Sequence, residues 1–459
     1  MTKQYACTDL GNGERFQDYY GYTVRYLIEE DRWLQHTENG WQHVDDGHQL
    51  TKPVVRRIYN EASDKASEGL NDSEGRQRLA NWAVYSESTT AQNHMLREAQ
   101  AMMGIHIWDF DADPLLINCK NGVVDLTTKT LIPHQPDRNI LDRRQLHLKR
   151  ANASYISDNR DYQRWVTFLW EIFNGDADLI NYVRIGLGYS TTGLVREHLF
   201  FLCHGTGRNG KGKLLDTVLH VLGDYARTSE FEIFLLSKKE LTDARRKEAI
   251  GNLRGRRFIV ASENKDSTQL NSALIKKLTG GEPLEGGKLY ADSFEFEPTH
   301  KIWLRGNHMP AITEGTDAIW ERTKAVPFKN RYVGKNDDTK LGDTLKAEAD
   351  GIFTYLVDAA NQYIHDGMPD MPEAIKIKTE DYRNENDKLS LFIKERIVRT
   401  PKMIVRNQPM VDRYEHWCRE NALLTDTSHF RKKMEERNVY SRRDKNGYYF
   451  IDCELVELK

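Results

Sequence analysis

One stretch, residues 198 to 226, constrains the fold of this chain more than any other: "HLFFLCHGTGRNGKGKLLDTVLHVLGDYA". An apolar run is followed by a glycine-rich turn and then by residues with helical spacing. The turn fits the pattern G-x-x-x-x-G-K, in which glycines let successive backbone N–H groups point at phosphate oxygens. The sequence therefore predicts a phosphate-binding loop between a buried strand and a helix.

The residues expected to bind the nucleotide form one continuous run. They are Gly205, Thr206, Gly207, Arg208, Asn209, Gly210, Lys211, Gly212 and Lys213. Lys211 would reach the β- and γ-phosphates, and the helix that starts near Lys213 would add the positive end of its dipole. Gly212 stands where such a loop normally carries the Ser or Thr hydroxyl that binds Mg²⁺. Water could replace that ligand, because Mg²⁺ usually keeps several waters in proteins.

Polar residues follow two further apolar runs. "FIVASE" ends in Ser262 and Glu263, and "KIWLRGN" ends in Asn307. We expect Glu263 to polarise the attacking water and, with Ser262, to hold Mg²⁺ through water. Asn307 is placed to orient the γ-phosphate or the water. The expected cofactors are thus ATP and Mg²⁺ with a water-rich ligand shell.

Strands alternate with helices around these motifs. The expected strands are 256–263 and 301–307, with a helix at "NSALIKKLTGG" and a hairpin at "EPLEGGKLYADSFEFEP" between them. This alternation predicts an α/β fold with a parallel sheet. A mixed section to about residue 150, with a hairpin around Asn39-Gly40, precedes a helical section at 161–194. The tail reads helix, helix and a hairpin around Asn446-Gly447, which is the layout of a winged helix.

An ordered set of motifs runs along nearly the whole chain. It comprises "LLINCKNGVVDLTTKTLIPHQPD", "GTGRNGKG" (motif A), "VASEN" (motif B), "LIKKLTGGEPLEGGKLYADSFEF" (motif B-prime), "IWLRGNHMP" (motif C), "WERTKAVPF" and "DYRNENDKLSLF". Together these motifs resemble superfamily 3 helicases, specifically the helicase part of phage, plasmid and poxvirus-type primase–helicases. The set carries more weight than any one motif, because motifs A to C fall in order within about a hundred residues.

The resemblance implies a fold and its divisions. These are a mixed α+β pre-helicase domain at 1–150, a helical collar at 151–195, an AAA+-like P-loop ATPase core at 196–370 and a C-terminal winged helix at 378–459. It also implies a ring, usually a hexamer, with each nucleotide between two subunits. Arg322 would then reach the neighbouring subunit's γ-phosphate, and Lys324 is the second candidate for this role. A surface arginine without this role is the alternative.

The resemblance also implies DNA contacts. The B-prime hairpin of this family points into the central channel, and here its candidates are Lys288 and Tyr290, since a cation follows phosphates and an aromatic ring stacks on bases. Gly286-Gly287 stand where a small residue and Arg are common in the family. In the tail, Arg442 and Arg443 are candidates for duplex DNA, with a solvated charged face as the alternative.

The implied function is a ring-forming, ATP-dependent DNA helicase in replication of a phage, plasmid or integrated element. It would move 3′ to 5′ on single-stranded DNA, act on forked DNA, and work with a separate primase or polymerase. Two alternatives stay open: a non-unwinding DNA-stimulated ATPase that serves as initiator, loader or defence protein, and a nucleotide kinase. Gly-Lys-Gly occurs in nucleoside monophosphate kinases, but a Thr follows it there and Lys213 follows it here.

Composition bounds the possible partners and location. The net charge is −3 and the isoelectric point is near 6.6, so positive charge that holds DNA must be local. No stretch approaches twenty apolar residues, and "MTKQYACTDLGNGERF" lacks the layout of a signal peptide. None of the five cysteines lies in a C-x-x-C pair, which fits a reducing compartment. We expect a cytoplasmic protein without membrane contact.

Two groups of residues resemble metal sites, but we do not assign them as such. "HIWDFDADPLL" contains Asp109, Asp111 and Asp113, and D-x-D pairs bind catalytic metals in many primases. The run leads straight into "INCKNGVVDL" with no catalytic domain around it, so we expect a solvated linker. Three histidines fall on the first hairpin and its following loop without ligand-like neighbours: His36, His43 and His48.

Overall fold

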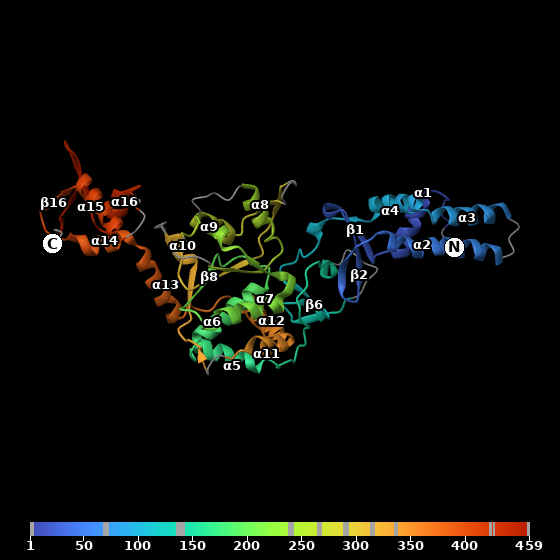
Figure 1. The fold of residues 1–459 in the computed structure, drawn as a ribbon, viewed down its shortest axis with the longest axis horizontal. Helices are drawn as coiled ribbons and strands as arrows, with labels where there is room; N and C mark the ends of the chain where they lie inside the picture. Colours follow the sequence, from blue (N-terminus) through green and yellow to red (C-terminus); the bar gives the residue numbers. More distant parts are fainter. Residues whose placement is uncertain are drawn as a thin grey trace.

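A computed structural model of the chain describes residues 4–67, 73–134, 143–236, 243–263, 269–287, 293–312, 317–334, 338–421, 425 and 427–456. The molecule is elongated, with the two termini at opposite ends and an α/β unit between them (Figure 1). Within those ranges, no helix combines the length and the apolar character that a bilayer crossing requires.

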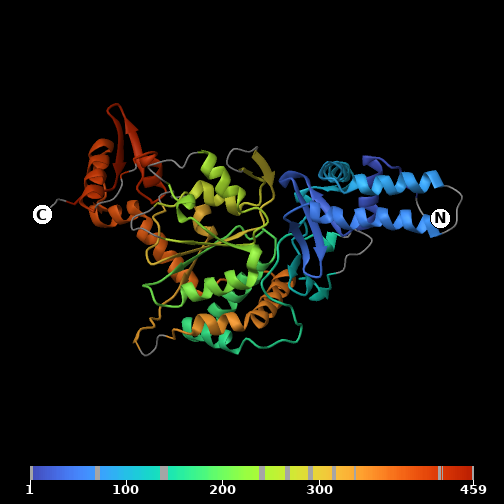
Figure 2. The same cartoon turned by 45° about the vertical axis from the view of Figure 1, so that its right-hand side comes forward.

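The N-terminal unit joins a small sheet to four helices. The sheet has the order β3 (Gly40–Val44), β2 (Arg32–Thr37), β1 (Val24–Leu27) and β4 (Gly104–Ile105). The helices are α1 (Asp9–Tyr20), α2 (His48–Ser67), α3 (Ser73–Ser86) and α4 (Thr89–Met103). The hairpin expected around Asn39-Gly40 is confirmed, because Thr37 pairs with Gly40 across the turn. Figure 2 shows these helices extending away from the central unit.

A second small sheet packs against the central unit. It is antiparallel and has the order β5 (Leu116–Cys119), β6 (Gly122–Asp125) and β7 (Thr130–Ile132). The buried side chains of β5 and β6 share one hydrophobic cluster with three helices: α5 (Gln163–Ile172), α6 (Ala177–Thr191) and α12 (Ala349–Asp366). The last strands of the expected 1–150 domain therefore share their core with the central unit.

The central sheet is parallel throughout, as the alternating pattern predicts. Its order is β14 (Thr323–Pro327), β8 (Phe200–His204), β13 (Lys301–Gly306), β10 (Phe258–Ser262) and β9 (Ala226–Ser229). The three inner strands are apolar because helices cover both faces. Alternate side chains of β8 enter different cores: Phe201 packs on the side of α6, α12 and α7 (Lys211–Leu222), and Phe200 packs on the side of α9 (Ser272–Thr279) and α10 (Asp317–Arg322).

Two more elements of the expected fold are present. The hairpin predicted after α9 is confirmed as β11 (Leu284–Gly287) and β12 (Ser293–Phe296). Its two predicted DNA contacts, Lys288 and Tyr290, lie outside the described residues. Helix α11 (Leu341–Ala347) packs against α7, and α13 (Glu373–Asn386) leads to the C-terminal unit (Figure 1).

The C-terminal unit has a hydrophobic core of its own, which includes Phe392, Trp417 and Phe450. Its helices are α14 (Lys388–Arg396), α15 (Asn407–Glu420) and α16 (Phe430–Glu435), and its main sheet has the order β16 (Ile404–Arg406), β18 (Gly447–Ile451) and β17 (Ser441–Asp444). The short strands β15 (Ile397–Val398) and β19 (Glu454–Leu455) form a second pair. The expected succession of two helices and a hairpin is confirmed.

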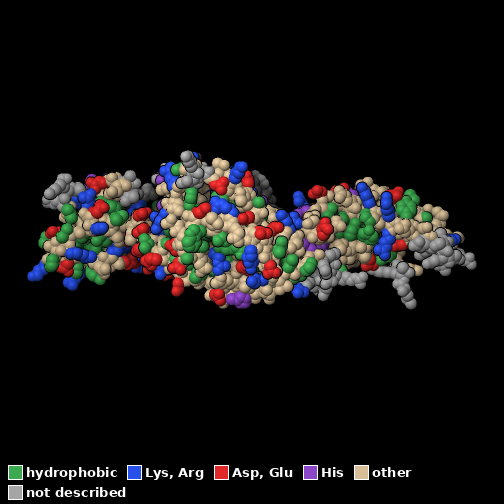
Figure 3. All heavy atoms as spheres, turned by 90° about the horizontal axis from the view of Figure 1, so that it is seen from below, with side chains coloured by type: hydrophobic (Ala, Val, Ile, Leu, Met, Phe, Trp, Pro, Cys, Tyr) green, Lys and Arg blue, Asp and Glu red, His purple; other side chains and the backbone are tan. Residues whose placement is uncertain are grey.

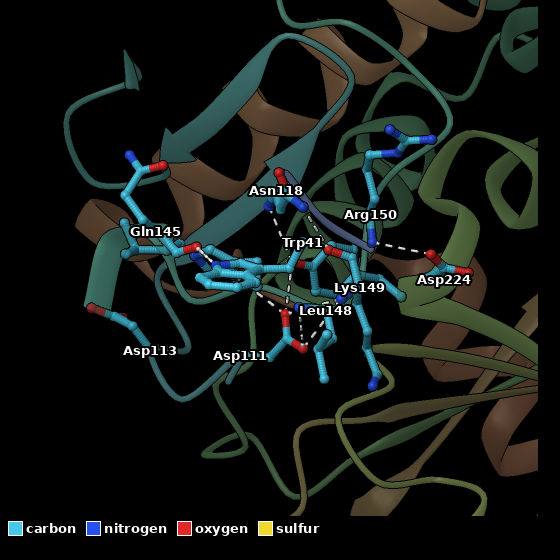
Figure 4. A network of polar contacts seen from close by, with 12 residues as sticks. Trp41, Asp111, Asp113, Asn118, Gln145, Leu148, Lys149, Arg150 and Asp224 are labelled. Carbon is cyan, nitrogen blue, oxygen red and sulfur yellow. Dashed lines mark hydrogen bonds and ion pairs between the residues drawn. The ribbon is translucent and has the colours of Figure 1, made fainter. Parts of the chain in front are cut away.

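Asp111 lies in a buried polar junction between the N-terminal and central units (Figure 4). Its carboxylate lies 3.2 Å from His147 Nδ1 and accepts hydrogen bonds from the backbone N–H groups of Leu148 and Lys149, both 3.2 Å, and from the Tyr225 hydroxyl, 3.3 Å. Burial alone would raise the pKa of this carboxyl, but the contact with His147 and the charge of Lys149 lower it below its usual value.

The expectation of a solvated linker is therefore wrong for Asp111. Its partners come from 36 to 114 residues further along the chain, so the local run of acidic residues carries no sign of them. The same junction contains the buried guanidinium of Arg257, which donates to Thr191 O at 2.9 Å and to Leu116 O at 2.5 Å. Arg257 directly precedes β10, so these two hydrogen bonds join the start of that strand to α6 and β5. It also lies over the Tyr225 ring, 4.6 Å from its centre.

Candidate functional site

The glycine-rich loop leaves the carboxyl end of β8 and enters α7. Its backbone has positive φ at Gly207 (87°), Arg208 (49°) and Gly210 (90°). A Cβ at Gly205 would overlap the backbone of Phe328, and one at Gly210 would overlap the side chain of Ile172. The loop therefore requires glycine at 205 for close packing and at 210 for both packing and conformation.

Lys211 is the first residue of α7, and its side chain folds back over the loop. It is 6% exposed, and its ammonium donates to Gly205 O at 2.5 Å and to Asn307 Oδ1 at 3.2 Å. Burial lowers the pKa of Lys211, and the nearby positive charge of Arg305 lowers it further. Two hydrogen bonds thus hold the ammonium between the loop and the end of β13.

Glu263 and Asn307 follow two neighbouring strands at the edge of the sheet where Lys211 lies. Glu263 directly follows β10 and Asn307 directly follows β13, so both lie at the carboxyl edge where the loop leaves β8. Glu263 Oε2 accepts a hydrogen bond of 3.0 Å from the backbone N–H of His308. Gly306 leaves room for this carboxylate, because a Cβ there would overlap it. Three residues chosen from sequence are therefore brought to one edge of the sheet.

The remaining loop side chains divide into two groups. Thr206 and Arg208 are exposed, whereas Asn209 is buried and its amide donates to Phe328 O at 3.3 Å. Asn209 therefore holds the loop against the chain that follows β14. The ammonium of Lys213 lies beside Gly342 on α11. Lys213 therefore contributes its backbone, and not its ammonium, to the first turn of α7.

Sequence reasoning missed Arg305 and Asp216. Arg305, the fifth residue of β13, donates from Nε to Ser262 Oγ at 2.5 Å and from Nη1 to Asp216 Oδ1 on α7 at 2.7 Å. A Cβ built at Gly212 would lie 3.5 Å from Nη1. A guanidinium thus fills the space beside the position that normally carries the loop hydroxyl. Only the spacing of Arg305, two residues before Asn307, could have indicated its place.

The oxygen donors at this edge fit a magnesium ion that is bound mainly by phosphates and water. Ser262 accepts the Arg305 hydrogen bond and Asp216 forms an ion pair with it, whereas the charge of Glu263 acts on Lys211. Mg²⁺ in nucleotide sites is commonly held by one or two carboxylates, several waters and the phosphates. The assignment of Glu263 and Ser262 to such an ion stays a prediction.

Arg322 lies far from the loop of its own chain. It ends α10, where its Nη1 donates to Ala318 O at 3.0 Å. In the register of the edge strand, Thr323 pairs with Phe200 and Pro327 pairs with His204, next to the loop. Four residues of strand separate the two positions by about 13 Å.

The candidate DNA contacts of the tail lie on an exposed strand. Arg442 and Arg443 are both exposed on β17. Arg443 pairs with Tyr448 on β18, and the guanidinium of Arg431 lies 3.5 Å from the centre of the same ring. This group forms a local basic and aromatic surface, while positive and negative side chains are mixed over the face shown in Figure 3.

Comparisons with known proteins show which family and which viral proteins this chain is similar to. Residues 13–174 match the family described as "D5 N terminal like". The chain is 24% identical over 406 residues to "Putative helicase L207/L206" of Acanthamoeba polyphaga mimivirus, which covers 81% of this chain and 41% of that protein. It is 25% identical over 342 residues to "Putative primase C962R" of African swine fever virus, which covers 69% of this chain and 34% of that protein.

A third relative and a solved structure extend the picture. "Putative helicase V13" of Sputnik virophage is 24% identical over 223 residues, 46% of this chain and 29% of that protein. The chain thus spans less than half the length of these three relatives. The apo structure of the NrS-1 C-terminal region has a similar fold, with a TM-score of 0.50 at 10% identity over 98% of this chain and 100% of that one.

Proposed function

We propose that the chain is a superfamily 3 DNA helicase that uses ATP through an AAA+-like P-loop core. The observation that carries the proposal is the contact of 3.2 Å between the Lys211 ammonium and Asn307 Oδ1 at the carboxyl edge of the parallel sheet. Ligands of open α/β sheets bind outside the carboxyl ends of the strands. The similarity to viral proteins named as helicases and primases supports the same function.

Each residue at the edge has a role in this proposal. The loop N–H groups and Lys211 bind the β- and γ-phosphates, Asn307 orients the γ-phosphate or the attacking water, and Glu263 accepts the proton of that water. Mg²⁺ that enters with the nucleotide would neutralise phosphate charge. When ATP binds, the Lys211 ammonium would exchange its contact with Gly205 O for a contact with a phosphate oxygen.

The position of Arg322 supports a ring. Since Arg322 lies at the far end of β14 from its own loop, a role at the γ-phosphate requires the loop of a neighbouring subunit. In a hexamer, every nucleotide would then lie between two chains, and hydrolysis in one would be sensed by the next. An arginine supplied in this way raises the rate of phosphoryl transfer by about 10³–10⁵.

The DNA substrate follows from the resemblance. Lys288 and Tyr290 would line the ring channel and grip one strand, which the ring follows 3′ to 5′, while Arg442 and Arg443 contact duplex DNA near the fork. Such a helicase would replicate a phage, plasmid or integrated element together with a separate primase or polymerase.

Strand displacement on a forked duplex tests the proposal. Wild type should unwind the fork with ATP, Lys211→Ala should not, and Lys346→Ala, which removes an exposed ammonium on α11, should match wild type. ATP hydrolysis without strand displacement would instead assign a non-unwinding ATPase. Phosphate transfer to a nucleoside monophosphate would assign a kinase, and unwinding by Lys211→Ala would overturn the role of the loop.

A further inference from the structure

The guanidinium of Arg305 bridges the end of β10 and helix α7, the two elements that would lie beside a bound triphosphate. Nε binds Ser262 at the end of β10, and Nη1 binds Asp216 on the first turns of α7. Arg305 itself lies on β13 between β8 and β10, paired with Cys203 on one side and Ser262 on the other. Its side chain is 26% exposed, so two partners fix a cation that still faces solvent.

Position 212 lies beside this cation and carries no side chain. Gly212 has no positive φ, so its backbone does not require glycine. Among the described residues, a Cβ there would meet Arg305 Nη1 at 3.5 Å and Asp216 Oδ2 at 3.7 Å, which are ordinary contacts. A hydroxyl at this position would therefore lie against the guanidinium, and the glycine leaves that face of Arg305 uncovered.

Two cations consequently share the edge of the sheet. Lys211 and Arg305 are close enough for the charge of the arginine to lower the pKa of the lysine. Asp216 offsets part of the Arg305 charge, but its own carboxylate is 54% exposed and in water's reach. A polyphosphate that enters the loop would meet both cations, and guanidinium groups bind phosphate with two parallel hydrogen bonds.

We propose that Arg305 is a phosphate-binding residue that replaces the hydroxyl-bound magnesium of other phosphate loops, so that this chain binds nucleoside triphosphates without a divalent cation. The inference rests on the proposed function of the loop and names a cation that the loop motif does not contain. Mg²⁺ remains a participant in hydrolysis, where it neutralises charge that develops on the phosphates.

Equilibrium titration with a fluorescent, non-hydrolysable ATP analogue tests this, once in Mg²⁺ and once in EDTA. Wild type should bind in EDTA within about tenfold of its affinity in Mg²⁺. Arg305→Ala should lose about 10- to 100-fold in EDTA, the size of one charged hydrogen bond, and distinctly less in Mg²⁺. Arg305→Lys should fall between them, and Arg227→Ala, which removes an exposed arginine of β9 in the same sheet, should match wild type.

A second variant restores the ordinary design of the loop. Gly212→Ser with Arg305→Ala should bind the analogue in Mg²⁺ but not in EDTA, because the hydroxyl again supplies a metal ligand. Thermal unfolding of each variant checks that it is folded. If wild type binds only in Mg²⁺, the inference is overturned and the loop assignment stands. If wild type binds the analogue in neither condition, the proposed function itself is overturned.

Discussion

The Lys211 ammonium and the Asn307 amide oxygen are 3.2 Å apart, although 96 residues separate them in the chain. One belongs to the helix that follows β8 and the other to the end of β13, and these strands are neighbours in the sheet. The contact therefore depends on the parallel order of the sheet as well as on the two residues. In the proposed function, both side chains would face the same end of a bound triphosphate.

Asn307→Ala should separate binding from hydrolysis. Loss of a group that orients the γ-phosphate or the water lowers kcat by about 10²-fold, whereas the loop and Lys211 retain most of the affinity for ATP. Steady-state hydrolysis and nucleotide titration measure the two effects. Asn446→Ala, an exposed asparagine in the tail hairpin, is the control. Equal losses in both measurements would make Asn307 a binding residue only.

A mixture of two inactive variants should regain activity if Arg322 acts on a neighbouring subunit. Lys211→Ala lacks a working loop and Arg322→Ala lacks the arginine, but a mixed ring contains interfaces where an intact loop meets an intact arginine. ATP hydrolysis by the co-assembled mixture should exceed that of either variant alone at the same total concentration. A mixture no more active than its components argues against action between subunits.

Two neighbouring glycines of the loop should respond differently to alanine. Gly210 has φ of 90°, and a Cβ there would overlap Ile172, so Gly210→Ala should cost about 2 kcal/mol or more of stability and abolish nucleotide binding. Gly212→Ala meets only ordinary contacts and lies in α7, where alanine favours the helix by about 1 kcal/mol relative to glycine. Thermal unfolding compares them, and equal midpoints would contradict this geometry.

The sequence predicted the elements of the site because their signals are local. The loop, the apolar strands and the polar residues that end them can each be recognised within a few residues, and parallel packing brings strand ends together. The pairing of Arg305 with Asp216 could not be predicted, because 89 residues separate them and the pairing depends on which strand lies beside the loop. Asp111 was misjudged for the same reason, since its hydrogen-bond donors are distant in sequence.

His36 should make the N-terminal unit sensitive to acid. The ring is 6% exposed, stands edge-on to Trp41 at 5.2 Å, and neither of its nitrogens has a hydrogen-bond partner among the described residues. Burial and, to a smaller extent, the charge of His134 together lower the pKa of His36 to about 4. The unfolded state therefore takes up the proton first.

Above the unfolded pKa of about 6.5, the neutral His36 ring makes its full contribution to the free energy of unfolding. As the pH falls toward 4, this contribution decreases by up to about 3 kcal/mol. His36→Phe keeps an aromatic ring and removes the titration. Unfolding midpoints recorded between about pH 8 and pH 4.5 should fall more steeply for wild type than for this variant. Parallel curves would show that His36 is not buried in its neutral form.

Calorimetric titration of a non-hydrolysable ATP analogue with Mg²⁺ tests the central claim most directly. Wild type should bind the analogue, Lys211→Ala should bind it at least about tenfold more weakly because a charged hydrogen bond is lost, and Lys346→Ala should match wild type. Equal affinity of wild type and Lys211→Ala would contradict the assignment of this loop as the nucleotide site.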